Sequence, residues 1–451
     1  MSNKSHEMDL CTGSLWKKIF IYSVPLMFTN ILQVLFNLSD VAVVGKFAGS
    51  IALGAVGSTS ILVTLFTGIL LGLSNGVNAF TALHIGSKDD EGLKHTVHTA
   101  IIICLAGGIL IAVFGIIAAH GILELMNTKD ELIGGAVLYM RIYLLGMPAL
   151  GLYNFGNAVL SAAGDTKRPL YYLAFAGVIN VILNLFFVIV CHLDVAGVAL
   201  ASVISQFISA ALILRALFTG KEKYCLRLSD IHFDKRKASG ILRIGIPSAF
   251  QYSIFAFANL FVQSSVNSFD HVLVEGNSAA ANADSLVYDM MAAFYTACSS
   301  FIAQNFGAKK RKRIARTYFI CLFYSFITSL VLGIGIYLAR YPFLSLFTND
   351  KEVIEAGIMR LSIMALSYCV SAFMDCSIAA SRGLGKTAVP TFVVIMGSCV
   401  FRIIWIYTIF AYFHTIQSLY IMYVFSWGIT ALVENIYFFR IYRRTLPGVK
   451  D

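Results

Sequence analysis

The sequence predicts an all-helical membrane protein in which one six-helix unit is used twice. Three observations support this fold class. The 451 residues are 58% hydrophobic and only 13% charged, which is more apolar surface than a soluble domain can hide from water. The apolar residues form runs long enough to cross a bilayer, for which about 20 residues are needed. Polar motifs also recur half a chain apart.

The apolar runs predict the transmembrane elements one by one. Strands of a membrane barrel would alternate polar and apolar residues over short segments, and these runs do not. We therefore expect twelve transmembrane helices, at about 19–45, 51–83, 98–123, 132–160, 170–190, 195–218, 241–269, 272–305, 317–339, 353–380, 388–413 and 415–439.

Short polar motifs recur at a spacing of 221 or 222 residues. GDTKRP at 164–169 returns as GKTAVP at 385–390, and HIGSK at 84–88 returns as NFGAK at 305–309. Further pairs are Pro25 with Pro247 and Asn37 with Asn259. Such self-similarity indicates a duplicated unit. Because six is even, both copies enter the membrane in the same direction. We expect two lobes related by a pseudo-two-fold axis along the membrane normal, with a cleft for alternating access between them.

The duplication and the charge pattern set the domain boundaries. We predict an amino-terminal lobe at 1–218 (helices 1–6), a cytoplasmic linker at 219–242 and a carboxy-terminal lobe at 243–451 (helices 7–12). With twelve spans, 27 of the 34 Lys and Arg residues fall on the side of the amino terminus, four on the other side and three within runs. Cationic loops stay on the cytoplasmic side. Both termini are therefore predicted to be cytoplasmic, and the net charge of +10 reflects topology rather than nucleic-acid binding.

Metal and disulfide signals are weak. The nine Cys residues include no C-x-x-C pair, so the sequence indicates neither a disulfide framework nor a zinc site. His95 and His98 form an H-x-x-H motif that we interpret as helix-end residues. We expect no cofactor.

Polar residues within the runs are the candidate functional residues. In the first helix Asn30, Gln33, Asn37 and Asp40 are spaced three, four and three apart, so they share one narrow arc at 3.6 residues per turn. Shorter stripes follow in later helices, at Asn154, Asn157 and Ser161, at Asn180 and Asn184, and at Ser202, Ser205 and Ser209.

Asp40 is the strongest candidate for ion coupling. Burial in a poorly solvated cavity disfavours the charged carboxylate, so we expect Asp40 to take up and release a proton during transport. In the alternative interpretation, Asp40 lies near the outer membrane surface and only helps to pack helices. Its repeat counterpart is Val262, which makes the two lobes chemically different.

The second lobe has its own charges within the runs, at Asp289, Asp375 and Arg402. In a structural interpretation, Arg402 pairs with Asp375 or Asp289 to compensate a charge at depth. In a functional one, a carboxylate binds a cation or a cationic substrate. Glu434 and Arg440 are expected to be interfacial. Pro25, Pro148 and Pro247 interrupt helices, and Pro25 is the candidate hinge.

The ordered set of motifs resembles the multidrug and toxic compound extrusion (MATE) family over nearly the whole chain. The residues that carry the resemblance are Pro25, NLSDVAVVG at 37–45, GDTKRP at 164–169, NVILN at 180–184, GVALASVISQ at 197–206 and QNFGAKKRKR at 304–313. The resemblance implies twelve helices in two lobes of a bacterial plasma-membrane protein. It also implies efflux of organic, often cationic, compounds driven by inward flow of protons or sodium ions.

The resemblance assigns roles residue by residue. Asp40 matches the amino-lobe carboxylate implicated in cation coupling, including sodium, with Asn180, Asn184, Ser202 and Tyr139 lining the same pocket. Some relatives have Asp at the position of Asn184. Others carry an acid in the seventh helix, where this chain has Gln251 and no acid between Pro247 and Asn267.

The sequence thus predicts a monomeric antiporter that is not an enzyme and binds no nucleic acid. The main alternative is a lipid-linked saccharide flippase of the same superfamily, although such proteins tend to have a more cationic cavity. An intramembrane enzyme would need a nucleophile–base pair or a metal cluster, and the runs contain no convincing one. A non-transporting scaffold would not need converging polar stripes.

Overall fold

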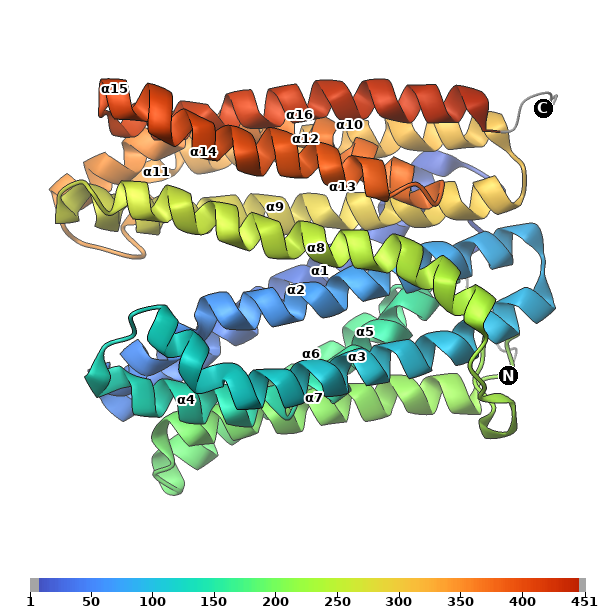
Figure 1. Cartoon of the computed structure of the whole chain (residues 1–451), viewed down its shortest axis with the longest axis horizontal. Helices are drawn as coiled ribbons and strands as arrows, with labels where there is room; N and C mark the ends of the chain where they lie inside the picture. The colour runs from blue at the N-terminus through green and yellow to red at the C-terminus, as the bar shows by residue number, and fades with distance from the viewer. Residues whose placement is uncertain (1–7, 446–451) are drawn as a thin grey trace. The chain divides into compact units, whose positions relative to one another are not determined.

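The computed structural model describes residues 8–445, and all regular structure in this range is helical (Figure 1). The outermost residues of both predicted cytoplasmic termini lie outside the described range. The elements of the first half are α1 Leu15–Val43, η1 Val44–Ala48, α2 Gly49–Ser87, α3 Asp90–Leu125, α4 Asp130–Leu144, α5 Met147–Ala162, α6 Lys167–Leu185, η2 Phe186–Val190, α7 Asp194–Thr219 and η3 Leu228–Asp230. Those of the second half are α8 Lys235–Val266, α9 His271–Gly307, α10 Arg311–Leu338, α11 Arg340–Leu344, α12 Lys351–Gly383, α13 Ala388–Val394, η4 Ile395–Val400, α14 Phe401–Trp405, η5 Ile406–Phe410, α15 Ala411–Phe413 and α16 Ile416–Arg444.

The predicted membrane fold is confirmed. Ten helical stretches in the described range are long and apolar enough to cross a membrane, or eleven if the bent pair α4–α5 counts as one span. The difference from twelve arises at the first stretch, Leu15–Ser87, which has 73 residues. At 1.5 Å per residue a straight helix of that length would measure about 110 Å, far more than a bilayer. Gly49 interrupts it with a φ of +89°, so the predicted runs 19–45 and 51–83 correspond to α1 and α2.

The backbone repeats together with the sequence motifs. Lys88 and Lys309, the last residues of HIGSK and NFGAK, both adopt a φ of +57°. Gly164 and Gly385 open the GDTKRP and GKTAVP turns at φ of +89° and +72°. Glycine recurs there because it enters this left-handed region at little steric cost.

Contacts divide the chain into two compact units. Unit 1 contains residues 8–9 and Phe28–Ala249, and unit 2 contains Leu10–Met27 and Phe250 onward. The chain changes unit within α1 and within α8, two residues after Pro25 and Pro247 respectively. The lobe boundaries drawn from the sequence, at 218 and 243, stay a prediction.

Within unit 1, α2 packs against α3, α4 and α5, while α7 packs against α4, α5 and α6. The buried core between them includes Leu70, Met140 and Leu144. On α3, Leu110, Phe114 and Ile117 are spaced four and three residues apart and are all more than 60% exposed. An apolar stripe of this kind suits contact with lipid rather than water.

Pro148 marks a break, as the sequence predicts. It lies in the first turn of α5, directly after the residues that separate α5 from α4. The two helices are bent by 46°. A proline in the first turn costs no helical hydrogen bond, because its missing N–H would have no partner there.

The amino-terminal segment of unit 2 is held by the basic motif at 309–313. Lys310 donates from Nζ to the carbonyl of Cys11 at 2.9 Å, and Arg313 donates to the carbonyl of Gly13 at 2.9 Å. Farther along α1, the hydroxyl of Tyr22 donates to Ser300 Oγ at 3.0 Å. The basic motif therefore holds the segment at residues 11–13 in place.

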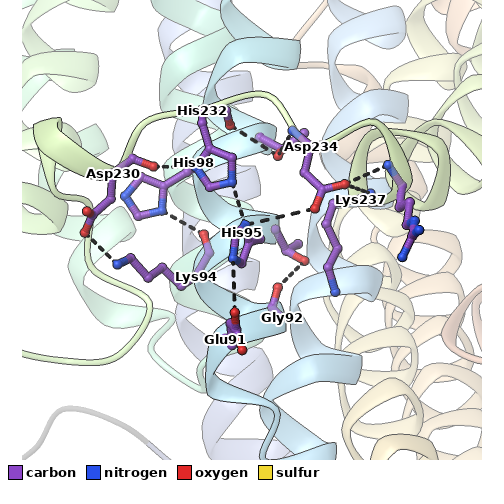
Figure 2. A network of polar contacts seen from close by, with 12 residues as sticks. Glu91, Gly92, Lys94, His95, His98, Asp230, His232, Asp234 and Lys237 are labelled. Atoms are coloured by element: carbon purple, nitrogen blue, oxygen red, sulfur yellow. Dashed lines mark hydrogen bonds and ion pairs between the residues drawn. The ribbon is translucent and has the colours of Figure 1, made fainter.

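The linker docks on α3 through a polar network (Figure 2). Lys94 Nζ lies 2.8 Å from Asp230 Oδ2, and the rings of His95 and His232 share a hydrogen bond. The backbone N–H of Arg227 donates to His98 Nε2 at 3.1 Å. The H-x-x-H pair at the start of α3 thus anchors the linker, and no group of three or more His, Cys, Asp or Glu in residues 8–445 could hold a metal ion.

Candidate functional site

Asp40 lies inside unit 1, where three helices meet. Its side chain is 8% exposed. One carboxylate oxygen accepts a short hydrogen bond from Asn184 Nδ2 on α6, and the other accepts one of 2.9 Å from Ser202 Oγ on α7. The structure therefore brings the predicted Asp40, Asn184 and Ser202 together.

Asn180 completes this network on the same face of α6. It donates from Nδ2 to Ser202 Oγ at 3.4 Å, and its Oδ1 accepts from Asn184 Nδ2 at 3.2 Å. The two asparagines are four residues apart, one helical turn, which places them one above the other. Asn184 Oδ1 is buried and has no hydrogen-bond partner in the described structure, so the network contains an acceptor oxygen free to take a cation or a proton donor.

The groups around Asp40 are neutral. Both of its bonds come from amide or hydroxyl donors, and no Lys, Arg or His within residues 8–445 forms an ion pair with it. A buried carboxylate without a cationic partner is costly. A proton or a cation would therefore stabilise this site by neutralising the carboxylate.

A close contact between α1 and α6 positions the carboxylate. Phe36 lies one turn before Asp40, and Gly177 lies one turn before Asn180. A Cβ atom at Gly177 would come within 1.7 Å of Phe36 Cζ. Only glycine leaves room for this ring, so Gly177 allows α1 to approach α6 closely enough for the Asp40 hydrogen bonds.

Irregular backbone borders the same site. The π-helical segment η1 begins four residues after Asp40, and η2 begins two residues after Asn184. Such π-segments are frequent at functional sites. Tyr139 on α4 is buried, and its ring stacks on that of Tyr143 with centroids 5.7 Å apart. Within residues 8–445, no hydrogen bond joins Tyr139 to the Asp40 network.

The remaining predicted polar residues of unit 1 lie outside this network. Gln33 and Asn37 are exposed and Asn30 is half-buried. On α5, Asn154 is buried, while Asn157 Oδ1 accepts a hydrogen bond from Ser161 at 3.3 Å.

The carboxylates predicted in unit 2 are separate from Arg402. Asp375 on α12 is buried, and its Oδ2 has no hydrogen-bond partner in the described residues. Asp289 on α9 is half-buried. No ion pair of the described chain joins Arg402 to either one, so the expected pairing is wrong. Glu434 is fully buried, which differs from its expected interfacial position, while Arg440 is exposed and its interfacial position stays a prediction.

Sequence reasoning missed the carboxylate that does compensate an arginine in unit 2. Asp284 on α9 forms an ion pair with Arg360 on α12, and its other oxygen accepts from the hydroxyl of Tyr368. Arg360 Nη1 also donates to Asn277 Oδ1 at 2.7 Å. The sequence does contain an indication of this pair. An arginine within an apolar run, such as Arg360, predicts an acid at similar depth, and Asp284 lies in the run 272–305.

Comparisons with known proteins agree with this architecture. The family model described as MatE matches residues 25–186 and again 247–408, and the two matches are offset by 222 residues (247 − 25). This independent offset supports the duplication. The probable multidrug resistance protein YpnP of Bacillus subtilis is 28% identical over 361 residues, covering 80% of each chain.

Solved structures show the same fold. A MOP superfamily transporter from Pyrococcus furiosus superposes with a TM-score of 0.92 at 22% identity, covering 99% of this chain and 100% of that one. An outward-facing MATE family multidrug resistance transporter gives 0.90 at 23% identity, covering 97% and 98%. The twofold family match spans well over half of the chain. The protein therefore belongs to the MATE family, which makes it a membrane-spanning multidrug efflux transporter of small molecules and not an enzyme.

Proposed function

We propose that the protein exports organic compounds, cationic ones among them, in exchange for protons or sodium ions that bind at Asp40. The observation that carries this proposal is the buried Asp40 carboxylate, held only by neutral donors. A charge of this kind is stabilised when a proton or a metal cation neutralises it. The oxygens of Asn180, Asn184 and Ser202 are hard ligands that suit sodium.

The proposed cycle links this neutralisation to the position of α1. A bound ion shifts a conformational equilibrium only if its affinity differs between the two states. Asp40 is on α1 while its donors are on α6 and α7, so the network can hold the ion fully only when α1 lies against α6. We propose Pro25, inside α1, as the hinge that lets α1 move.

The remaining features of the proposal concern the cellular setting. The transporter works as a monomer in the bacterial plasma membrane with both termini in the cytoplasm, as the distribution of Lys and Arg indicates. It uses no cofactor, since the ion gradient supplies the energy. It also binds no nucleic acid, because the Lys and Arg residues follow the membrane topology.

Uptake of a fluorescent cation into inside-out vesicles tests the proposal. A proton gradient and a sodium gradient are imposed separately, on wild-type protein, on Asp40→Asn and on the matched control Asp130→Asn, an exposed acid at the start of α4. We expect wild type and Asp130→Asn to respond to one gradient and Asp40→Asn to neither. Full gradient-driven uptake by Asp40→Asn would remove Asp40 from the mechanism.

A further inference from the structure

Arg402 is a buried cation with neutral surroundings. Its side chain is 2% exposed. Nε donates to Ser426 Oγ at 3.3 Å and Nη1 donates to Asn259 Oδ1 at 3.2 Å. The guanidinium carbon lies 4.5 Å from the ring centroid of Tyr423. All these partners belong to unit 2.

These contacts leave the charge of Arg402 uncompensated. The hydroxyl and the amide are neutral, and contact with an aromatic face attracts a desolvated cation only in part. A buried charge is costly unless it is paired. Arg360, in the same unit, is paired with Asp284, whereas Arg402 contacts no carboxylate within residues 8–445. Its Nη2 makes no hydrogen bond within residues 8–445.

The position of Arg402 in the duplicated unit is the second observation. With the offset of 222 between the two family-model matches, Arg402 occupies the position of Asn180 (402 − 222). Asn259 likewise occupies the position of Asn37. The Asp40 site is built from α1, α6 and α7, and Arg402 with its partners comes from α8, α14 and α16. These three segments occupy the same places in the second repeat.

Irregular backbone surrounds this arginine as well. Arg402 lies on the five-residue segment α14, which separates the two π-helical segments η4 and η5. In unit 1, π-segments border Asp40 and Asn184 in the same way. Widened turns redirect side chains and occur often at functional sites.

We propose that Arg402, flanked by Asn259, Ser426 and Tyr423, binds an anionic group of the exported compound, a carboxylate or a phosphate. The guanidinium fork presents parallel donors that match either group. The ring of Tyr423 lies beside it and suits an aromatic acid. Calling the ligand a cargo rests on the proposed export function; the anion site itself does not. The exported compounds would then include zwitterions that carry both an amine and an acid.

Equilibrium binding of a matched dye pair tests the site. Rhodamine 110 has a free carboxylate, and rhodamine 123 is its methyl ester. Fluorescence anisotropy with the full chain in detergent, without any gradient, gives the affinity for each dye. We expect wild type to bind the acid at least tenfold more tightly than the ester. Arg402→Gln should remove this preference by weakening acid binding alone, and Arg402→Lys should keep part of it.

Each outcome decides the question. No preference in wild type, or an equal loss of both dyes in Arg402→Gln, would overturn the anion site. If Arg402→Gln does not yield folded protein by size exclusion, wild type titrated with phenyl phosphate and with benzylamine replaces it, and thermal stabilisation by the amine alone would be the negative result. Because no gradient is present, failure of ion coupling in the vesicle assay leaves this measurement unaffected, and the reverse also holds.

Discussion

The two units place opposite charges at corresponding places. In unit 1 the buried charge is Asp40, whose partners are neutral donors. In unit 2 the position of Asp40 is Val262, and one buried charge is the cation Arg402, whose partners are two neutral acceptors and the ring of Tyr423. The duplication has thus kept the helical framework, including the left-handed turns, while the chemistry of each half has diverged.

Unit 2 also contains a buried charge, Arg360, that is compensated within the protein. Arg360 has an ion pair with Asp284, a hydrogen bond to Asn277, and the rings of Tyr420 and Tyr423 at 5.2 and 5.7 Å. Asp40 and Arg402 lack such a counter-ion within the described residues. The difference separates a charge that an ion pair compensates from two charges that we propose bind ligands.

The largest expected effect is on thermal stability, which should distinguish the paired carboxylate Asp284 from the unpaired Asp40. Asp284→Asn leaves Arg360 buried without its counter-ion, and breaking a buried pair in this way costs about 3 kcal/mol. Asp40→Asn removes a buried charge that has no cationic partner, so stability should stay the same or rise. Thermal unfolding in detergent, without ligand, measures both.

A double variant controls for the loss of the carboxylate itself. Asp284→Asn combined with Arg360→Met removes both charges and should recover most of the lost stability, because an apolar replacement of a buried pair is often neutral. Equal destabilisation by Asp284→Asn and Asp40→Asn would show that both carboxylates are structural.

The next effect concerns the approach of α1 to α6. Gly177→Ala places a Cβ atom 1.7 Å from the Phe36 ring, so the helices must separate and the Asp40 hydrogen bonds must lengthen. Overpacking of this kind costs about 1–3 kcal/mol, and a displacement of 1 Å at a functional site lowers rates by about 100-fold. Gradient-driven uptake in vesicles should fall steeply, while the acid preference of unit 2 should persist.

Two further variants make this test specific. Gly57→Ala, at a helical position on α2 with nothing within 4 Å of the added carbon, should leave transport unchanged. Adding Phe36→Ala to Gly177→Ala should restore part of the uptake by making room for the methyl group. Unchanged uptake in Gly177→Ala alone would mean that the α1–α6 contact does not position Asp40.

Replacing one serine in each unit should have a smaller effect on ligand or ion affinity. Ser202→Ala removes one donor to Asp40, and Ser426→Ala removes one acceptor from Arg402. A single hydrogen bond contributes about 1 kcal/mol, which is roughly a fivefold change in affinity. Ser202→Ala should change the ion concentration for half-maximal uptake, and Ser426→Ala should weaken rhodamine 110 binding in the anisotropy assay. A change in the opposite assay for either variant would contradict the division of roles.

The sequence predicts the fold and the Asp40 network well for a physical reason. Apolar runs report spans directly, and residues three or four apart on a helix share a face in any packing, which groups Asn180 with Asn184. The family resemblance, not the spacing, places these two residues beside Asp40. By contrast, Gln33 and Asn37 share the arc of Asp40 and yet are exposed, because burial depends on packing against other helices, which spacing within one helix does not report.

Charge partners across helices could not be predicted from the same information. Asp375 and Arg402 both lie within runs, but their pairing depends on how α12 and α14 are rotated, which no local spacing reports. The apolar run 272–305 shows that Asp284 lies at membrane depth, but not that it faces Arg360 rather than another cation. Long-range packing decides which acid meets which arginine, and here it joins Asp284 to Arg360.

The smallest effect lies outside both sites, in the linker. The side-chain hydrogen bond from Lys94 lowers the pKa of Asp230 below its ordinary value of 3.8, and backbone donation from Lys237 lowers the pKa of Asp234. A lowered pKa means that docking of the linker on α3 is favoured above pH about 4 and weakens only as the pH falls through the lowered values. Asp230 and Asp234 should therefore add no pH dependence to hydrogen exchange of the amides at 227–234 between pH 7 and 5, after correction for intrinsic rates. Lys94→Met should raise exchange there severalfold at pH 7, because Asp230 loses its partner, without changing dye preference or ion coupling. A change in either of those would show that the linker controls the charged sites instead of merely joining the repeats.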